Sequence, residues 1–99
     1  MSLLAREQTT TFSIEEYGEI AITWRVPTAL DVNKMYDYNG NILDREKIFR
    51  NHVVSIKAAE DGLCTIDGFL TAPGTGGAFL LVVRKILDLS SLQVEEKKE

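Results

Sequence analysis

The most constraining feature of the chain is an apolar segment near its C-terminus, residues 73–92, which reads PGTGGAFLLVVRKILDLSSL. At about 100° per residue, its apolar side chains cover an arc of roughly 200°, against the roughly 100° stripe of an ordinary surface helix. We therefore predict a long helix over residues 76–91. A helix this apolar needs more than one neighbour, so it either crosses the middle of a small domain or leaves part of its arc for another molecule.

The size and composition of the chain fit one small globular domain. It has 99 residues, of which 44 % are hydrophobic and 26 % charged, and its mean hydropathy is −0.06. A chain this short buries only about two-thirds of its unfolded surface, so we expect marginal stability unless subunits add to it. We predict a single domain over residues 9–94, a poorly patterned segment before it (1–8) and a charged tail after it (95–99).

Charge and hydropathy argue against nucleic-acid and membrane partners. The net charge is −4 and the isoelectric point is near 5.0. Phosphate binding needs a basic patch, and the lysine and arginine residues are scattered. The longest apolar run, residues 78–83, is far shorter than the ~20 residues that cross a bilayer, and the N-terminus does not resemble a signal peptide. We expect a cytosolic protein.

Alternating apolar residues near the N-terminus predict a β-hairpin over residues 9–26. Apolar and polar positions alternate on both sides of a four-residue link, 15–18, that ends in glycine. Residues 13–16 also fit a helix capping box, but no helical period follows them. An isolated hairpin is barely stable in water, so its apolar face must be covered. The residues predicted to share that face are Phe12, Ile14, Ile20, Ile22, Trp24 and Val26.

Two short elements are predicted after the hairpin. Pro27 lacks a backbone donor and ends the second strand. Residues 28–31, TALD, match a helix start signal, and a helix over 29–38 follows. Residues 39–41, NGN, form a strong turn signal because asparagine and glycine tolerate positive φ.

The middle of the chain predicts two more helices. Apolar residues at spacings of three and four favour a helix over residues 44–57, although the β-branched residues 53–56 leave a strand as the alternative. A helical turn over residues 65–71 is capped by Thr65 and ended by Pro73. The predicted fold is therefore α+β, with an N-terminal hairpin packed on three to four helices and a long helix at the C-terminus.

The sequence offers little material for catalysis. His52 is the sole histidine and falls near the apolar face of its helix, which favours a structural role. Cys64 is the sole cysteine and has no basic neighbour, which indicates a buried, unreactive thiol. The loop at residues 74–77 resembles a phosphate loop but lacks its lysine, so a tight turn or flexible joint is the better interpretation. Carboxylates occur as surface runs. We expect no enzyme activity, no cofactor and no metal.

Apolar surface is the functional feature that remains. A small domain with a broadly apolar final helix and an edge-bearing hairpin is suited to self-association, since hairpin edges pair with strands and helices fill grooves. We therefore expect partners to be proteins. The predicted interaction residues are Phe12, Trp24, Phe79, Leu80, Val83 and Leu87.

Five segments carry a resemblance to a known family. They are residues 24–31 (WRVPTALD), 49–56 (FRNHVVSI), 60–62 (EDG), 67–75 (DGFLTAPGT) and 85–98. In their order and spacing, over roughly residues 20–99, they resemble the tail assembly chaperones of long-tailed bacteriophages.

The resemblance implies a non-catalytic protein of the host cytoplasm in an infected or lysogenic cell. Members of that family bind the tape measure protein, recruit tail tube protein and assemble as rings or spirals, so a homo-oligomer is expected here. Two alternatives stay open: a small structural virion protein, such as a head–tail or tube component, and a small regulatory or ligand-binding domain of the host.

Overall fold

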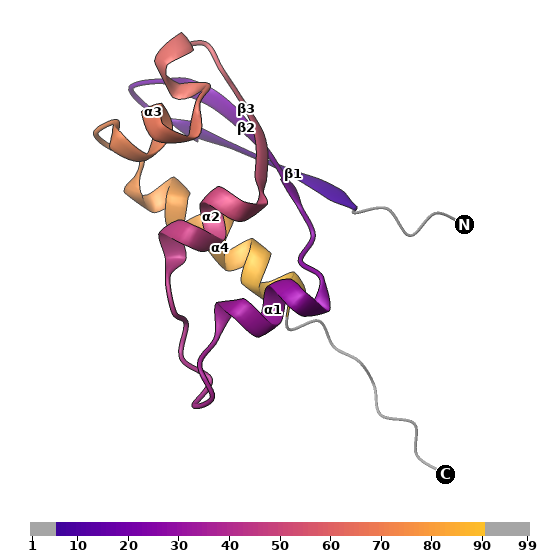
Figure 1. Cartoon of the computed structure of the whole chain (residues 1–99). Coiled ribbons are helices and arrows are strands. Elements are labelled where there is room, and N and C mark those ends of the chain that lie inside the picture. Colours follow the sequence, from indigo (N-terminus) through magenta and orange to yellow (C-terminus); the bar gives the residue numbers. More distant parts are fainter. Residues whose placement is uncertain (1–5, 91–99) are drawn as a thin grey trace.

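The computed structural model describes residues 6–90 and contains a three-stranded antiparallel sheet in the order β1-β2-β3 (Figure 1). The strands are β1 (Glu7–Ile14), β2 (Gly18–Arg25) and β3 (Val53–Ala58). The predicted hairpin is confirmed, with Phe12 opposite Ile20 in its register. β1 begins at Glu7, so Glu7 and Gln8 belong to the strand and not to the unpatterned segment predicted before residue 9.

Helix α1 (Ala29–Met35) begins as its start signal predicts. The Thr28 hydroxyl accepts a hydrogen bond from the Asp31 backbone amide at 3.3 Å, and the Asp31 carboxylate accepts one from the Thr28 amide at 2.8 Å. This reciprocal capping satisfies two amides that an uncapped helix would leave without partners. Pro27 separates the cap from the end of β2.

A short loop, residues 36–42, follows α1. The helix stops at Met35, short of its predicted end, because Tyr36 adopts extended backbone and forms an isolated bridge with Ile42. The predicted turn is confirmed: Gly40 has φ of 84°, a conformation that glycine adopts without steric cost. The loop projects from the lower end of the molecule in Figure 1.

The helix predicted over residues 44–57 is wrong in its second half. Helix α2 (Arg45–His52) ends at His52, and β3 begins at the next residue. Val53 and Ile56 are both buried, a spacing of three that imitates a helix. A register shift in the pairing with β2 produces this spacing in a strand, because Val54 has no partner of its own. The strand alternative for 53–56 is therefore the correct one.

The remaining elements are a 3-10 turn, η1 (Asp61–Leu63), and helices α3 (Ile66–Thr71) and α4 (Gly76–Ser90). Thr65 caps α3 as predicted, its hydroxyl accepting a hydrogen bond from the Gly68 amide at 3.0 Å. The predictions of α3 and α4 are confirmed within the described residues. Residue 91 and the charged tail predicted over 95–99 lie outside them.

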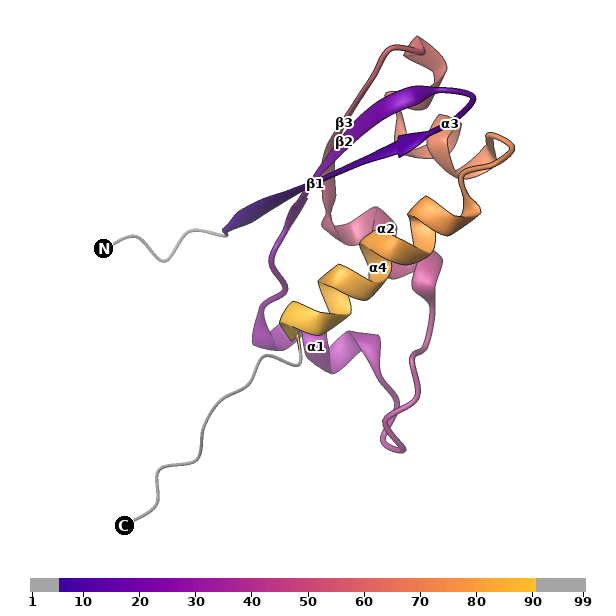
Figure 2. The same ribbon diagram turned by 180° about the vertical axis from the view of Figure 1, so that it is seen from behind.

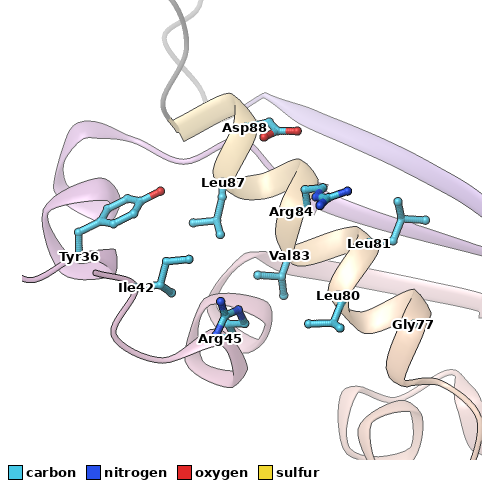
Figure 3. A pocket seen from close by; sticks show the side chains of 10 residues that line it. All are labelled: Tyr36, Ile42, Arg45, Gly77, Leu80, Leu81, Val83, Arg84, Leu87 and Asp88. Carbon is cyan, nitrogen blue, oxygen red and sulfur yellow. The ribbon is translucent and has the colours of Figure 1, made fainter. Parts of the chain in front are cut away.

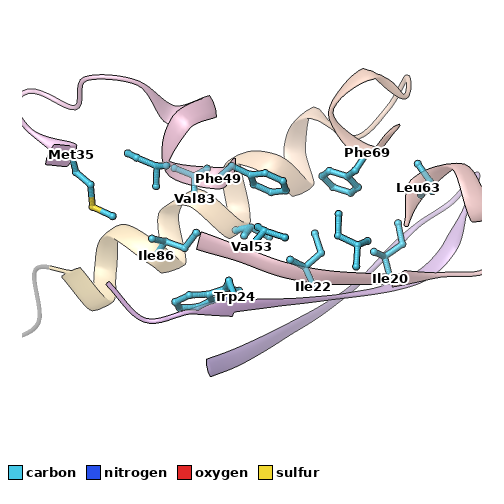
Figure 4. Close-up of a cluster of buried hydrophobic side chains, with 13 residues drawn as sticks. Ile20, Ile22, Trp24, Met35, Phe49, Val53, Leu63, Phe69, Val83 and Ile86 are labelled. Atoms are coloured by element: carbon cyan, nitrogen blue, oxygen red, sulfur yellow. The ribbon is translucent and has the colours of Figure 1, made fainter. Parts of the chain in front are cut away.

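The helices lie on one side of the sheet, as the front and back views show (Figures 1 and 2). Every second residue of β2 is buried on that side. Full burial of one large apolar side chain contributes about 1.5–3 kcal/mol, so this shared interior holds sheet and helices together (Figure 4). The core consists of Ile20, Ile22, Trp24, Met35, Ile48, Phe49, Val53, Ile56, Leu63, Phe69, Val82, Val83 and Ile86. The fold class is α+β, as predicted, and β3, the alternative left open for residues 53–56, adds a third strand to the hairpin.

Candidate protein-interaction surface

The six residues predicted to contact other chains do not share one surface. Trp24 and Val83 are only 2 % and 1 % exposed, so both belong to the core and are unavailable to another protein. Leu80 is 54 % exposed and lies on the outside of α4. The half-buried members are Phe12, Phe79 and Leu87.

The burial of Trp24 and Val83 corrects the prediction and follows from their places in the fold. Trp24 lies on the central strand, on the face that the helices cover, and its Nε1 donates to the Thr10 hydroxyl at 3.0 Å. Val83 lies on the core side of α4 with Val82 and Ile86. A helix that is apolar over most of its circumference gives no signal of which side the sheet will cover.

Phe12 and Phe79 lie at the margin of an aromatic cluster. Phe69 stacks on Phe49 with ring centroids 5.6 Å apart. Phe12 meets Phe69 edge-on at 6.5 Å, and Phe79 meets Phe49 at 5.3 Å. Aromatic pairs of this kind contribute about 0.5–1.5 kcal/mol beyond the area they bury. Both residues therefore support the core and offer only part of their surface to a partner.

An open groove of about 660 Å³ runs beside the outer side of α4, and we call it the α1–α4 groove (Figure 3). Its apolar lining includes Leu80 and Leu81, which are 54 % and 37 % exposed. Side chains from three parts of the chain meet there: α4, the loop after α1 and the first residue of α2. The lining residues are Tyr36, Ile42, Arg45, Gly77, Leu80, Leu81, Val83, Arg84, Leu87 and Asp88.

A second open groove, of about 600 Å³, lies between the start of α2 and the start of α4, and we call it the α2–α4 groove. Arg45 lines both grooves, so the two are neighbours along α4. Two adjacent glycines line different grooves: Gly76 lines the α2–α4 groove, and Gly77 lines the α1–α4 groove. The lining residues of the second groove are Asp44, Arg45, Glu46, Arg50, Leu70, Thr71, Ala72, Thr75, Gly76 and Phe79.

Charges at the rim of the α2–α4 groove neutralise one another. The Arg50 guanidinium lies 2.8 Å from a Glu46 carboxylate oxygen and 2.7 Å from one of Asp67. Glu46 and then Asp67 raise the pKa of Arg50, so its charge is constant at any physiological pH. Exposed pairs of this kind contribute about 0–1 kcal/mol. The rim is therefore close to neutral at this point, and the apolar part of the groove lining includes Leu70 and Phe79.

A partly buried charge pair positions α1 against the sheet. Arg25 of β2 donates from Nη1 to Asp31 at 2.8 Å and from Nε to the Asn51 carbonyl at 3.2 Å. The Arg25 guanidinium, with help from the Thr28 cap, holds the pKa of the Asp31 carboxyl well below its usual range. This contact joins β2, α1 and the end of α2.

His52 is buried, as its predicted position on the apolar face of its helix indicates. It is 2 % exposed, and its Nδ1 lies 2.8 Å from the Ile48 carbonyl. A carbonyl only accepts, so we assign the proton to Nδ1. Nε2 lies 3.5 Å from an Asp31 oxygen and has no hydrogen-bond partner within residues 6–90. Over the same range, no group of three His, Cys, Asp or Glu side chains is placed to hold a metal ion.

The predicted burial of Cys64 is wrong, because the residue is exposed. It follows η1 near the surface, where its Sγ lies 3.6 Å from the Ala58 carbonyl and 3.7 Å from that of Glu60. The apolar residue before it, Leu63, takes the buried position instead.

The glycine-rich loop ahead of α4 is a tight turn. Gly74 has φ of 85°, and the buried Thr75 hydroxyl lies 2.8 Å from the Phe69 carbonyl and 2.9 Å from that of Ala72. The Tyr17 hydroxyl donates to the Pro73 carbonyl at 2.7 Å. These contacts hold the loop against α3 and the hairpin, which favours the turn over the flexible joint.

The sequence did not indicate which residues of other elements line the α1–α4 groove together with α4. Tyr36, Ile42 and Arg45 come from the loop and from the start of α2, and only the tertiary fold brings them to α4. Tyr38 was also missed as a surface residue, although an aromatic side chain beside an Asn-Gly turn is a signal of exposure.

None of the helices described between residues 6 and 90 is both long and apolar enough to cross a bilayer. Comparison with protein-family models, curated proteins and solved structures gave no significant match to this chain.

Proposed function

We propose that the chain is a non-catalytic tail assembly chaperone of a long-tailed phage or prophage. In the host cytoplasm it would bind the tape measure protein, recruit tail tube protein and associate with further copies of itself. The order of sequence segments set out above supports the proposal. The observation that carries it is structural: the outer side of α4 borders two open, partly apolar grooves.

The α2–α4 groove is the proposed site for the tape measure protein. A groove with an apolar floor and a charged rim suits the apolar side of an amphipathic helix, whose anchors recur every three to four residues. Its volume of about 600 Å³ is within the usual range of ligand pockets, roughly 300–1,000 Å³. Room for a few side chains matches a partner that presents short apolar stretches.

The small size of this groove implies weak binding by a single copy. Association costs an estimated 4–15 kcal/mol in lost freedom, and a few buried side chains offset little more than that. Many copies along one long tape measure chain would bind strongly together through effective concentration. Weak single contacts also let tail tube subunits displace the chaperone one copy at a time.

A matched pair of variants tests this assignment. Gly76→Glu and Gly77→Glu each add a carboxylate in the first turn of α4, where a new Cβ meets nothing within 4 Å and a negative charge suits the helix dipole. In co-expression with a tape measure fragment from the same phage genome, Gly76→Glu is expected to abolish co-purification and to leave the fragment insoluble. Gly77→Glu is expected to retain binding. Equal binding of the fragment by the wild type and both variants would contradict the assignment.

A structural virion protein is the alternative, since β1 and β3 leave two sheet edges for pairing with other subunits. Mass spectrometry of purified particles separates the two functions. A chaperone is absent from the finished particle, whereas a stoichiometric presence there would establish the virion component.

A further inference from the structure

The loop of residues 36–42 presents an aromatic side chain that its own chain leaves uncovered. Tyr38 at its tip is 101 % exposed, while the loop itself is firmly held. One Asp37 carboxylate oxygen accepts hydrogen bonds from the amides of Asn39 and Asn41, both at 2.9 Å. The Asp37 amide donates to the Asn41 carbonyl at 2.9 Å. A preorganised tip loses little conformational freedom on binding, which is the property of an anchor.

The tip and the α1–α4 groove are complementary in apolar character and in charge. The groove offers leucine side chains to an aromatic ring and carries two cations, Arg45 and Arg84, against one acidic residue. Neither arginine forms an ion pair within residues 6–90. Asp37 is the only charged residue of the loop, and hydrogen bonds from Asn41 and Asn39 lower its pKa, so it is an anion at neutral pH.

The tip does not reach the groove of its own chain. Tyr36 and Ile42, at the base of the loop, themselves line that groove (Figure 3). The loop projects from the lower end of the molecule in Figure 1. The full exposure of Tyr38 shows that its side chain does not lie in the groove of its own chain.

We propose that the Tyr38 tip of one copy inserts into the α1–α4 groove of a second copy, with Asp37 facing Arg45 and Arg84. Such a contact joins two different surfaces, so it can repeat from copy to copy. The contact gives a structural basis for the self-association in the proposed function. Only the biological role of the contact rests on that function. Its test needs the purified chain alone, so its failure is separate from a failure to bind the tape measure protein.

Light scattering on two variants and their mixture tests the contact. Tyr38→Ser removes the tip and retains the groove, while Gly77→Glu obstructs the groove and retains the tip. The wild-type mass is expected to rise to multiples of 11.1 kDa with concentration. Each variant alone is expected to associate at least roughly tenfold more weakly, the loss of one aromatic anchor. A mixture of the two is expected to form a heterodimer, because one intact tip then meets one intact groove.

Two results of this experiment would overturn the proposal. Association of Tyr38→Ser at wild-type strength would exclude the tip as the anchor. A mixture that contains no heterodimer would mean that the tip of one copy does not bind the groove of another. Circular dichroism of both variants, expected to equal that of the wild type, shows that each one folds.

A photoreactive probe identifies the occupant of the groove directly. Leu81→benzoylphenylalanine in the full chain, with ¹⁴N- and ¹⁵N-labelled copies mixed, is expected to cross-link to residues 36–42 of another copy. Cross-links to residues 91–99 of the same chain would instead assign the groove to the chain's own end and overturn the proposal. Absence of cross-links in an associating sample would also overturn it.

Discussion

The two sides of helix α4 differ in what covers them. Val82, Val83 and Ile86 are buried against the sheet and the other helices, whereas Leu80 and Leu81 border an open groove. The same type of residue thus holds the fold on one side and remains exposed on the other. The difference teaches that an apolar arc of roughly 200° exceeds what the interior of one small domain can cover.

The largest expected effect is a loss of stability on the inner side. Ile86→Ala should lower the free energy of unfolding by about 2–5 kcal/mol, because Ile86 is fully buried and truncation leaves a cavity. Leu80→Ala, on the outer side of the same helix, should change it by no more than about 0.5 kcal/mol. Urea titration of both variants measures the difference. Equal losses would show that the outer side supports the monomer fold as well.

A second prediction concerns the charge pair of Arg25 and Asp31, which joins β2 to α1. Asp31→Ala should destabilise the fold by about 1.5–3 kcal/mol, since it leaves a partly buried guanidinium and a helix cap without their acceptor. The measurement is chemical denaturation at neutral pH. An unchanged midpoint would mean that α1 is held by other contacts.

The same pair makes stability depend on pH. The folded pKa of Asp31 lies below its ordinary value of 3.8, so its contribution is complete at neutral pH. That contribution is lost as the pH falls below about 4. Denaturation of the wild type should therefore show a decline in acid that is smaller in the Asp31→Ala variant. Identical acid profiles for both proteins would contradict the assignment.

Local signals predicted much of the fold. The hairpin, the caps at Thr28 and Thr65, the turn at Gly40 and the long last helix each depend on residues close in sequence. Such elements are determined by hydrogen bonds and backbone preferences within one or two turns, which a single sequence displays.

Tertiary pairing determined what the sequence did not reveal. Residues 53–56 form a strand because β2 offers them a free edge, and the shifted register at Val54 imitates helical spacing. The prediction of the interaction residues was partly wrong for the same reason. Trp24 and Val83 were assigned to the surface, yet which side of an apolar element is covered depends on neighbours far away in the chain. The loop that completes the α1–α4 groove gave no periodic signal at all.

A fourth prediction sharpens the contrast at the start of α4. Gly77→Ala should raise the free energy of unfolding by about 0.5–1 kcal/mol, because alanine favours the helix and its Cβ meets open space. Thermal denaturation measures this gain. A loss of stability would contradict this expectation and would indicate that the backbone at residue 77 requires glycine.

The smallest expected change in stability belongs to Leu80→Glu. It should leave circular dichroism and the unfolding midpoint near those of the wild type, within about 0.5 kcal/mol, while it removes self-association. Sedimentation velocity beside a denaturation curve measures both properties. Loss of folding would place Leu80 in the core and contradict its 54 % exposure.

The most direct test is the native mass of the full chain, measured by light scattering as concentration rises, alone and with a tape measure fragment. The expected result is a mass above the 11.1 kDa of one copy that grows with concentration and includes the fragment when it is present. A mass of one copy at every concentration, unchanged by the fragment, would contradict the proposal that the outer side of α4 binds other chains.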